Sequence, residues 1–228
     1  MQWKCEQEVD FNIMLDKEKK ELELLIQRYA VLKSCQKDIA KAYDILEKSY
    51  AAGGKLLVCG NGGSAADSEH IVGELMKGFK NPRKLSVEQC EKLEGVDAEL
   101  GKVLAEELQG ALPAIALDGH PGLTTAYMND CEPLLCFAQQ VNGFGKKEDV
   151  LLGISTSGNS KNILYAAVVA KAKGMKVIGL TGQRDNKLEK YADVCIHVPQ
   201  TETYMVQELH LPVYHALCLM LEDHFFSF

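Results

Sequence analysis

The chain has 228 residues, of which 46% are hydrophobic and 25% charged, and its formal net charge is −7. These proportions are ordinary for a globular chain with a sizeable core, and the negative charge argues against nucleic acid or an anionic membrane as the main partner. No apolar run reaches the roughly 18–20 residues of a membrane helix, and the acidic N-terminus lacks a signal peptide's apolar core, so we expect a cytoplasmic protein without membrane contact.

Helical spacing of apolar residues predicts two helices over about residues 10–52, which end at the glycine pair 53–54. Short apolar runs then alternate with helical patterns, most clearly at 161–173, closed by Gly174, and at 204–225. This alternation predicts an α/β fold with a parallel sheet covered on both faces. The predicted strands are 56–59, 114–117, 150–154, 176–180 and 194–198.

The first strand leads into a glycine-rich turn at 60–63 and then a helix that starts near Ser64. Glycines let the backbone approach a ligand, and the unpaired N–H groups of the first helical turn point at it, so this turn is a candidate anion site. His70 and Glu74 are four residues apart and share a face of that helix, which places groups capable of proton or metal chemistry nearby. Asp67 either joins them or only favours the helix N-terminus electrostatically.

A second loop follows the strand at 150–154. It contains the hydroxyls of Ser155, Thr156, Ser157 and Ser160, and a helix comes directly after it. Hydroxyl donors at a helix N-terminus suit a phosphate group, whereas the alternative is ordinary helix capping. Neither loop matches the Walker pattern or Gly-x-Gly-x-x-Gly, so we expect no nucleotide cofactor.

Two motifs carry a family resemblance: Cys-Gly-Asn-Gly-Gly-Ser at 59–64 and Gly-Ile-Ser-Thr-Ser-Gly-Asn-Ser at 153–160. Together they resemble the sugar isomerase (SIS) proteins, and within them the phosphoheptose isomerases. The resemblance implies a three-layer α/β/α sandwich with a five-stranded parallel sheet, preceded by N-terminal helices. It also implies ketose–aldose isomerisation of sedoheptulose 7-phosphate to a D-glycero-D-manno-heptose 7-phosphate-type product.

The resemblance implies roles for individual residues. Glu74 and His215 match the acid–base pair that transfers protons through an enediol. The substrate-binding positions match Asn61, Gly62, Gly63, Ser64, Asn129, Asp130, Ser155, Thr156, Ser157, Ser160 and Gln207. Some family members hold Zn²⁺, and the matching ligands here are His70, Glu74, Gln207 and His215, although the same residues can serve acid–base chemistry without metal.

The alternative function is a non-catalytic SIS protein that binds a phosphosugar or a replication initiator protein. Such relatives lack the glutamate and the late histidine, and this chain has both, at positions 74 and 215. The family resemblance further implies a homotetramer with its sites at subunit interfaces. We therefore expect residues 1–52 to form a helical region that contacts another subunit, followed by the SIS domain at 53–228.

The sequence departs from the family pattern in three places. A longer connection at about 81–112 predicts an extra short helix that forms a lid or a subunit contact. Gly78 stands where relatives often carry an arginine, for which Lys77, Lys80 or Arg83 are candidate substitutes. Pro212 lies inside the last helix and predicts a kink there.

Overall fold

The computed structural model describes residues 16–226, so the predicted helix start at residue 10 lies outside the described residues. Its centre is a five-stranded sheet in the order β2-β1-β3-β4-β5, and every pairing is parallel. The strands are β1 (Leu56–Cys59), β2 (Ala114–Ala116), β3 (Val150–Ile154), β4 (Lys176–Thr181) and β5 (Val194–His197). All five predicted strands are confirmed, and their ends shift by at most one residue.

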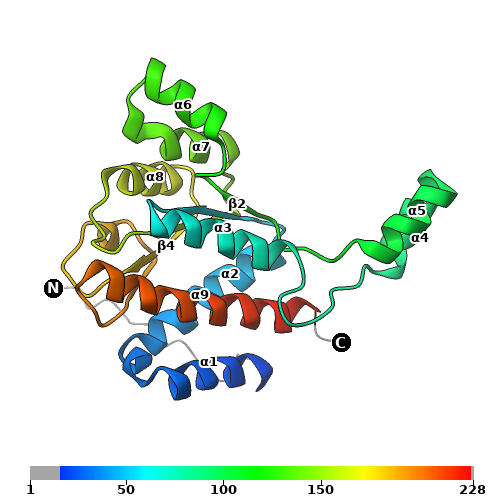
Figure 1. Ribbon diagram of the computed structural model, residues 1–228, viewed down its shortest axis with the longest axis horizontal. Coiled ribbons are helices and arrows are strands. Elements are labelled where there is room, and N and C mark those ends of the chain that lie inside the picture. The colour runs from blue at the N-terminus through cyan, green and yellow to red at the C-terminus, as the bar shows by residue number, and fades with distance from the viewer. Residues whose placement is uncertain (1–15, 227–228) are drawn as a thin grey trace.

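Helices cover both faces of the sheet, which makes three layers (Figure 1). The cause lies in the strands, because alternate residues point to opposite faces. Leu56 and Val58 join the core that contains α1, α2, α3 and α9, whereas Leu57 and Cys59 join the core that contains α7 and α8. The helices are α1 (Asp16–Arg28), α2 (Gln36–Ala51), α3 (Gly63–Met76), α6 (Pro121–Asp130), α7 (Cys136–Phe144), α8 (Lys161–Ala172) and α9 (Thr203–Phe226), with short 3₁₀ segments η1 (Ala30–Cys35), η2 (Pro133–Leu135) and η3 (Leu188–Lys190).

The N-terminal region forms three segments, α1, η1 and α2, where two helices were predicted. Leu22 and Leu25 of α1 are buried in the same core cluster as the last helix, and α1 lies alongside α9 in Figure 1. The domain boundary at 52–53 stays a prediction. None of the described helices is long and apolar enough to cross a membrane.

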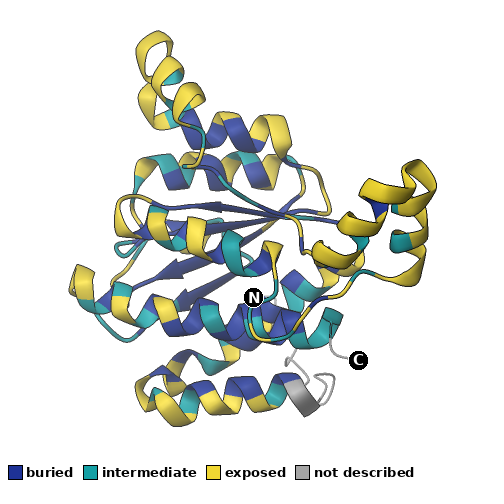
Figure 2. Cartoon of the chain, turned by 45° about the vertical axis from the view of Figure 1, so that its right-hand side comes forward, coloured by how far each residue is buried: buried dark blue, intermediate teal, exposed yellow. Residues whose placement is uncertain are grey.

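The connection at 81–112 holds two helices, α4 (Val87–Val96) and α5 (Ala98–Glu107), so the predicted extra helix is present together with a second one that was not predicted. Asp97 separates them, because its side chain accepts hydrogen bonds from the N–H groups of Glu99 and Leu100 and starts α5. The helices form a hairpin that projects from the body and is largely exposed (Figures 1 and 2). An antiparallel bridge between Lys84 and Gln109 closes its base.

A buried ion pair joins the base of this hairpin to α9. The side chains of Arg83 and Glu222 are both 0% exposed, and Arg83 Nε donates to Glu222 Oε1 over 2.8 Å. Glu222 also accepts from the backbone N–H groups of Phe79, Lys80 and Asn81. Burial alone would raise the pKa of Glu222, but these donors outweigh it and hold the pKa below its ordinary value of 4.5.

α9 continues past Pro212, so the proline does not end the helix. The missing N–H of a proline costs one backbone hydrogen bond, which packing against neighbouring elements can offset. Pro212 itself is buried, between Leu211 and Val213. A kink at this position stays a prediction.

The buried pair generates a stability prediction. We expect Arg83→Met to lower the free energy of unfolding by about 3–5 kcal/mol, because Glu222 stays buried without its cation. Denaturant unfolding followed by circular dichroism measures the change. The matched control is Lys92→Met, which breaks the exposed pair with Glu88 and should cost less than about 1 kcal/mol. Equal losses in the two variants would contradict the prediction.

The pair of Arg83 and Glu222 also predicts that the free energy of unfolding depends on pH. Because the folded pKa of Glu222 lies below its unfolded value, its stabilisation is present above the unfolded pKa and is lost as pH falls through the folded pKa. Unfolding free energies measured from pH 7 downwards should therefore fall on the acid side. In Arg83→Met, the free energy of unfolding should fall less steeply as the pH is lowered, since the variant raises the folded pKa of Glu222. An unchanged slope would contradict this account of the pair.

Candidate active site

The candidate site lies along two helices that run side by side in the same direction, α3 and α9. At one end, a Cβ added to Gly63 would come within 2.6 Å of the amide nitrogen of Gln207, so the two residues are in close contact. Seven residues further along each helix, His70 meets Tyr214, with a distance of 3.0 Å from the ring Nδ1 to the hydroxyl. This alignment decides which of the predicted residues meet.

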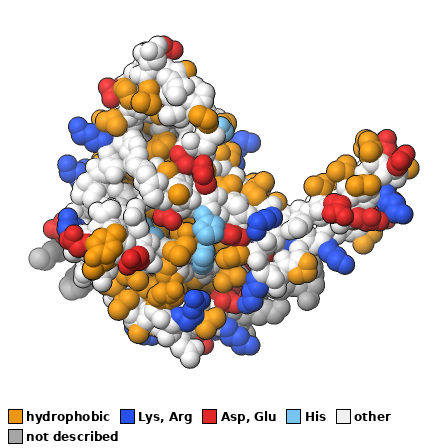
Figure 3. All heavy atoms as spheres, viewed as in Figure 1, with side chains coloured by type: hydrophobic (Ala, Val, Ile, Leu, Met, Phe, Trp, Pro, Cys, Tyr) orange, Lys and Arg blue, Asp and Glu red, His pale blue; other side chains and the backbone are white. Residues whose placement is uncertain are grey.

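Three of the residues predicted to do proton chemistry lie together at the second end. His70 Nε2 lies 3.2 Å from Glu74 Oε1. The rings of His70 and His215 stand edge to face with their centroids 5.0 Å apart, and Phe79 packs against His215 from another side. Figure 3 shows histidine side chains at the surface in the middle of this face, with charged side chains beside them.

His215 has a free nitrogen in this group. Its Nε2 atom is buried and has no hydrogen-bond partner among the described residues. Burial lowers the pKa of His215, and the nearby His70 lowers it further. The ring is therefore neutral near pH 7 and holds one nitrogen ready to accept or donate a proton.

Two further residues belong to this end: Asp67, for which the sequence left two roles open, and Tyr214, which the sequence did not indicate. The Tyr214 hydroxyl donates to Asp67 Oδ1 over 3.1 Å and also contacts His70, so Asp67 joins the group rather than only favouring a helix end. Tyr214 directly precedes His215, but only the alignment of α3 with α9 shows that it faces this way.

The loop at residues 155–160, here called the hydroxyl loop, lies at the carboxyl end of β3. Ligands bind at this end of the strands in open parallel sheets. Ser155 and Ser160 face each other with Oγ atoms 3.0 Å apart, and the backbone between them turns through Gly158 at φ 62°. Ser160 is the first residue before α8, yet its side chain makes no capping hydrogen bond. Ordinary capping therefore does not account for this hydroxyl.

The glycine-rich turn at residues 60–63, here called the glycine loop, lies beside the hydroxyl loop, at the carboxyl end of β1. Asn61 exchanges two hydrogen bonds with Asn162 at the start of α8, over 3.1 and 2.7 Å, which ties the two loops together. Gly62 adopts φ 58°, a left-handed conformation that glycine adopts without strain. Ser64 is buried. The two loops thus form one polar surface at the N-termini of α3 and α8.

Asn129 and Asp130 are not part of this surface within one chain. They lie on α6, are exposed, and bond to each other through the Asn129 amide and the Asp130 carboxylate. No hydrogen bond joins them to either loop among the described residues. Their part in substrate binding stays a prediction.

Three other histidines, His197, His210 and His224, lie outside this group. His210 is fully buried, and burial lowers its pKa to about 4, so it stays neutral. His224 bonds to Glu18 over 2.7 Å, and His197 Nδ1 lies 3.0 Å from Thr181 Oγ1.

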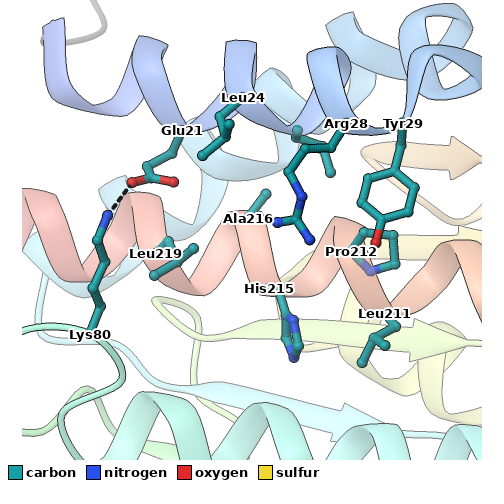
Figure 4. Close-up of a pocket in the computed structure, with 11 residues that line it drawn as sticks. Glu21, Leu24, Arg28, Tyr29, Lys80, Leu211, Pro212, His215, Ala216 and Leu219 are labelled. Atoms are coloured by element: carbon teal, nitrogen blue, oxygen red, sulfur yellow. Dashed lines mark hydrogen bonds and ion pairs between the residues drawn. The ribbon is translucent and has the colours of Figure 1, made fainter.

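A pocket of about 400 Å³ opens between α1 and α9, on the other side of His215 (Figure 4). Arg28 points into it from α1, and Lys80 lies at its far end, paired with Glu21. The lining residues are Glu21, Leu24, Leu25, Arg28, Tyr29, Lys80, Leu211, Pro212, His215, Ala216 and Leu219. Of this set, His215 was predicted to be catalytic and Lys80 was a candidate substitute for the arginine of relatives. The others were not predicted, because sequence spacing does not show which side of α9 faces α1.

The predicted zinc ligands are only partly assembled. His70 Nε2 and Glu74 Oε1 converge, and His215 Nε2 has no partner, which suits a ligand role. Yet nowhere in residues 16–226 do three or more His, Cys, Asp or Glu side chains form a group that could hold a metal ion. Zinc binding by these residues therefore stays a prediction.

Known proteins resemble this chain in sequence and in fold. The model of the SIS domain family matches residues 24–90 and 94–182, so the chain is a SIS-domain protein. The phosphoheptose isomerase of Rhodospirillum rubrum is 38% identical over 192 residues, which cover 84% of this chain and 88% of the relative.

Two solved structures extend the comparison. A phosphoheptose isomerase from Francisella tularensis superimposes with a TM-score of 0.70 at 32% identity, covering 91% of this chain and 97% of the other. One from Neisseria gonorrhoeae gives 0.66 at 30% identity, covering 90% and 91%. The chain belongs to the phosphoheptose isomerase family.

The hydroxyl loop generates a prediction. A Cβ at Gly158 would lie 2.3 Å from Asn186 Cβ, at a backbone conformation that L-residues rarely adopt. We expect Gly158→Ala to weaken binding of a sugar phosphate at least tenfold, because the loop must shift away from the geometry that aims its hydroxyls. Isothermal titration calorimetry measures this affinity. Gly143→Ala on α7 is the control, because nothing lies within 4 Å of its Cβ, and it should bind normally.

Proposed function

We propose that this protein is a ketose–aldose isomerase that converts sedoheptulose 7-phosphate to a D-glycero-D-manno-heptose 7-phosphate-type product. The observation that carries the proposal is the placement of Glu74 beside His70 and His215 on the same α3–α9 pair whose other end adjoins the two loops. The phosphoheptose isomerases to which the chain is similar support the choice of substrate.

In the proposed reaction Glu74 removes the proton from C1 of the ketose, which gives an enediol, and returns it to C2. His215 moves a proton between the two oxygens, giving one to the C2 carbonyl oxygen and taking one from the C1 hydroxyl. A neutral imidazole suits this exchange, and the lowered pKa of His215 keeps it neutral. No proton is gained or lost overall.

The phosphate group binds at the hydroxyl loop in this proposal. Its oxygens accept from the hydroxyls of Ser155, Thr156, Ser157 and Ser160, and the N-terminus of α8 favours the negative charge. The sugar chain then lies along α3 toward Glu74. Asn61, Gly62, Gly63, Ser64 and Gln207 form the wall it passes.

The alternative is a binding protein without catalysis. It is not favoured, because such a protein needs no proton-transfer group, whereas this chain gathers Glu74, His70 and His215 at one place. The similarity to phosphoheptose isomerases over most of the chain points the same way.

Zinc binding by His70, Glu74, Gln207 and His215 is a separate proposal, and no step above runs through a metal. Its support is the convergence of His70 and Glu74, with the His215 ring 5.0 Å from that of His70. Elemental analysis of the purified protein tests it. Zinc in the wild type that is lost in His70→Gln would support this ligand set, and equal zinc content would reject it.

We also propose a homotetramer in which the α4–α5 hairpin contacts another subunit. The outer side of α5 carries Leu100, Val103 and Leu104, which are 64%, 55% and 41% exposed and share one helix face. An apolar stripe of this kind on a projecting hairpin is typical of an interface. The cytoplasmic location expected from the sequence stays a prediction.

The enzymatic proposal predicts that Glu74→Gln abolishes turnover of sedoheptulose 7-phosphate. The loss should be at least 100-fold, because the amide cannot take the C1 proton, while binding of the sugar phosphate persists. A coupled assay and calorimetry measure the two quantities. Glu23→Gln, an exposed change on α1, is the control and should keep full activity.

Two outcomes would reject this assignment. If the wild type turns over none of a panel of five-, six- and seven-carbon ketose phosphates, with or without added zinc, the isomerase proposal fails. If Glu74→Gln loses its fold together with binding, Glu74 is structural.

The proposed contact through the α4–α5 hairpin can be tested by removing the hairpin at its base, where Lys84 and Gln109 form an antiparallel bridge. Replacing residues 85–108 by a two-residue Asn-Gly turn should leave the body folded, because the two ends already pair. We expect the mass in solution, measured by light scattering, to fall below that of the wild type. The double variant Leu100→Glu, Leu104→Glu should act in the same direction. An unchanged mass in both would reject the contact.

A further inference from the structure

Asn159 lies in the hydroxyl loop, but its side chain joins that loop to a different one. Its Nδ2 atom donates to the backbone carbonyl of Ser157 over 2.8 Å and to that of Asp185 over 3.4 Å. Its Oδ1 atom accepts from the backbone N–H of Lys187 over 3.1 Å. The amide therefore uses both of its hydrogens and its oxygen. Asn159 was not among the predicted substrate-binding residues.

The second loop is formed by residues 182–188, here called the support loop, which lead from β4 into η3. Its backbone bonds to the hydroxyl loop at two more points. The N–H of Gly182 donates to the carbonyl of Thr156 over 3.0 Å, and the N–H of Leu188 donates to the carbonyl of Gly158 over 3.1 Å. The hydroxyl loop is thus fastened to the support loop on both sides of residue 157, and again by the Asn159 side chain.

Ser157 is held by Asn159 at two atoms. The side chain of Asn159 bonds to the Ser157 carbonyl, and the backbone N–H of Asn159 donates to the Ser157 hydroxyl oxygen over 3.2 Å. A serine hydroxyl has one hydrogen and two lone pairs, so an oxygen that accepts from Asn159 keeps its hydrogen for another acceptor. A phosphate oxygen is an acceptor of this kind.

The side chain of Asn159 matters because anion binding depends on donors that are already in place. Without this amide, the Lys187 N–H and the Ser157 carbonyl lose these partners, and the hydroxyl loop gains conformations in which its donors point elsewhere. A ligand would then have to order the loop as it binds, which weakens its affinity.

We propose that Asn159 is a positioning residue, which ties the hydroxyl loop to the support loop and thereby aims the Ser157 hydroxyl at the phosphate of the substrate. The inference rests on the proposed function, in which the phosphate binds at the hydroxyl loop. It adds the residue that holds this loop in its binding geometry.

Isothermal titration calorimetry of the full chain tests the proposal with two probes, sedoheptulose 7-phosphate and inorganic phosphate. We expect Asn159→Ala to weaken the binding of both about tenfold, because a hydrogen bond to a charged group is no longer held in place. Asn159 is exposed, so the variant should keep its fold, as measured by circular dichroism. Asn142→Ala, an exposed change on α7, is the matched control and should bind both probes normally.

A double-mutant cycle separates this role from a general loosening of the loop. Ser157→Ala alone should also weaken binding about tenfold, since it removes the hydroxyl itself. The double variant Ser157→Ala, Asn159→Ala should bind no more than about twofold weaker than Ser157→Ala, because no hydroxyl is left to aim. Independent effects would instead multiply to about 100-fold.

Kinetics supply the link to turnover. Asn159→Ala should raise KM about tenfold and change kcat less than about twofold, because Glu74 and His215 lie on α3 and α9, outside the hydroxyl loop. Unchanged affinity in Asn159→Ala, loss of its fold, or independent effects in the cycle would overturn the proposal.

The same measurements distinguish this proposal from the proposed function. A wild type that binds the sugar phosphate without turning it over, while the variants behave as expected, would refute the isomerase and leave the positioning role standing. A wild type that binds neither probe would refute the phosphate site and overturn the positioning role with it.

Discussion

The arrangement of the site depends on the buried pair between Arg83 and Glu222. Arg83 also donates to the backbone carbonyls of Glu74 and Leu75, so one guanidinium ties the end of α3 to the end of α9. A buried ion pair is weak as a source of net stability, but an unpaired alternative is costly, which makes such a pair effective at fixing one arrangement. Here it fixes how far along α9 the helix α3 lies.

That register determines which side chains of the candidate site meet. Gly63 meets Gln207 at one end and His70 meets Tyr214 at the other, so both helices contribute to the polar surface at each end. A shift of one residue along either helix would turn the contact faces by about 100° and separate these partners. The glycine at position 63 is part of the same constraint, because a side chain there would displace the Gln207 amide.

Much of this was predictable from the sequence, and the failures have physical causes. β1 and β3 were predicted with correct ends because short, buried apolar runs bounded by polar residues or glycine have few other interpretations. The 3₁₀ segment Ala30–Cys35 was taken for α-helix because Leu32 and Cys35, three residues apart, suit either period. The hairpin helix that was not predicted is α4, because none of its residues is buried and its apolar periodicity is correspondingly weak.

The candidate site was predictable only in part. The glutamate and histidines stand out by residue type and by family motif, whereas Tyr214 becomes visible only when two helices separated by more than a hundred residues are placed side by side. The same holds for Arg28, which reaches the pocket beside His215 from α1. Contacts between distant elements carry no local signal, and so no pattern within one segment could have shown them.

Among the described residues, the buried Nε2 of His215 has no hydrogen-bond partner, and this bears on the stability of the fold. A buried polar atom without a partner costs about 1–3 kcal/mol of stability. An apolar residue of similar size at this position would avoid that cost. Stability therefore does not explain the histidine at position 215, in contrast to the apolar residues that surround it in α9.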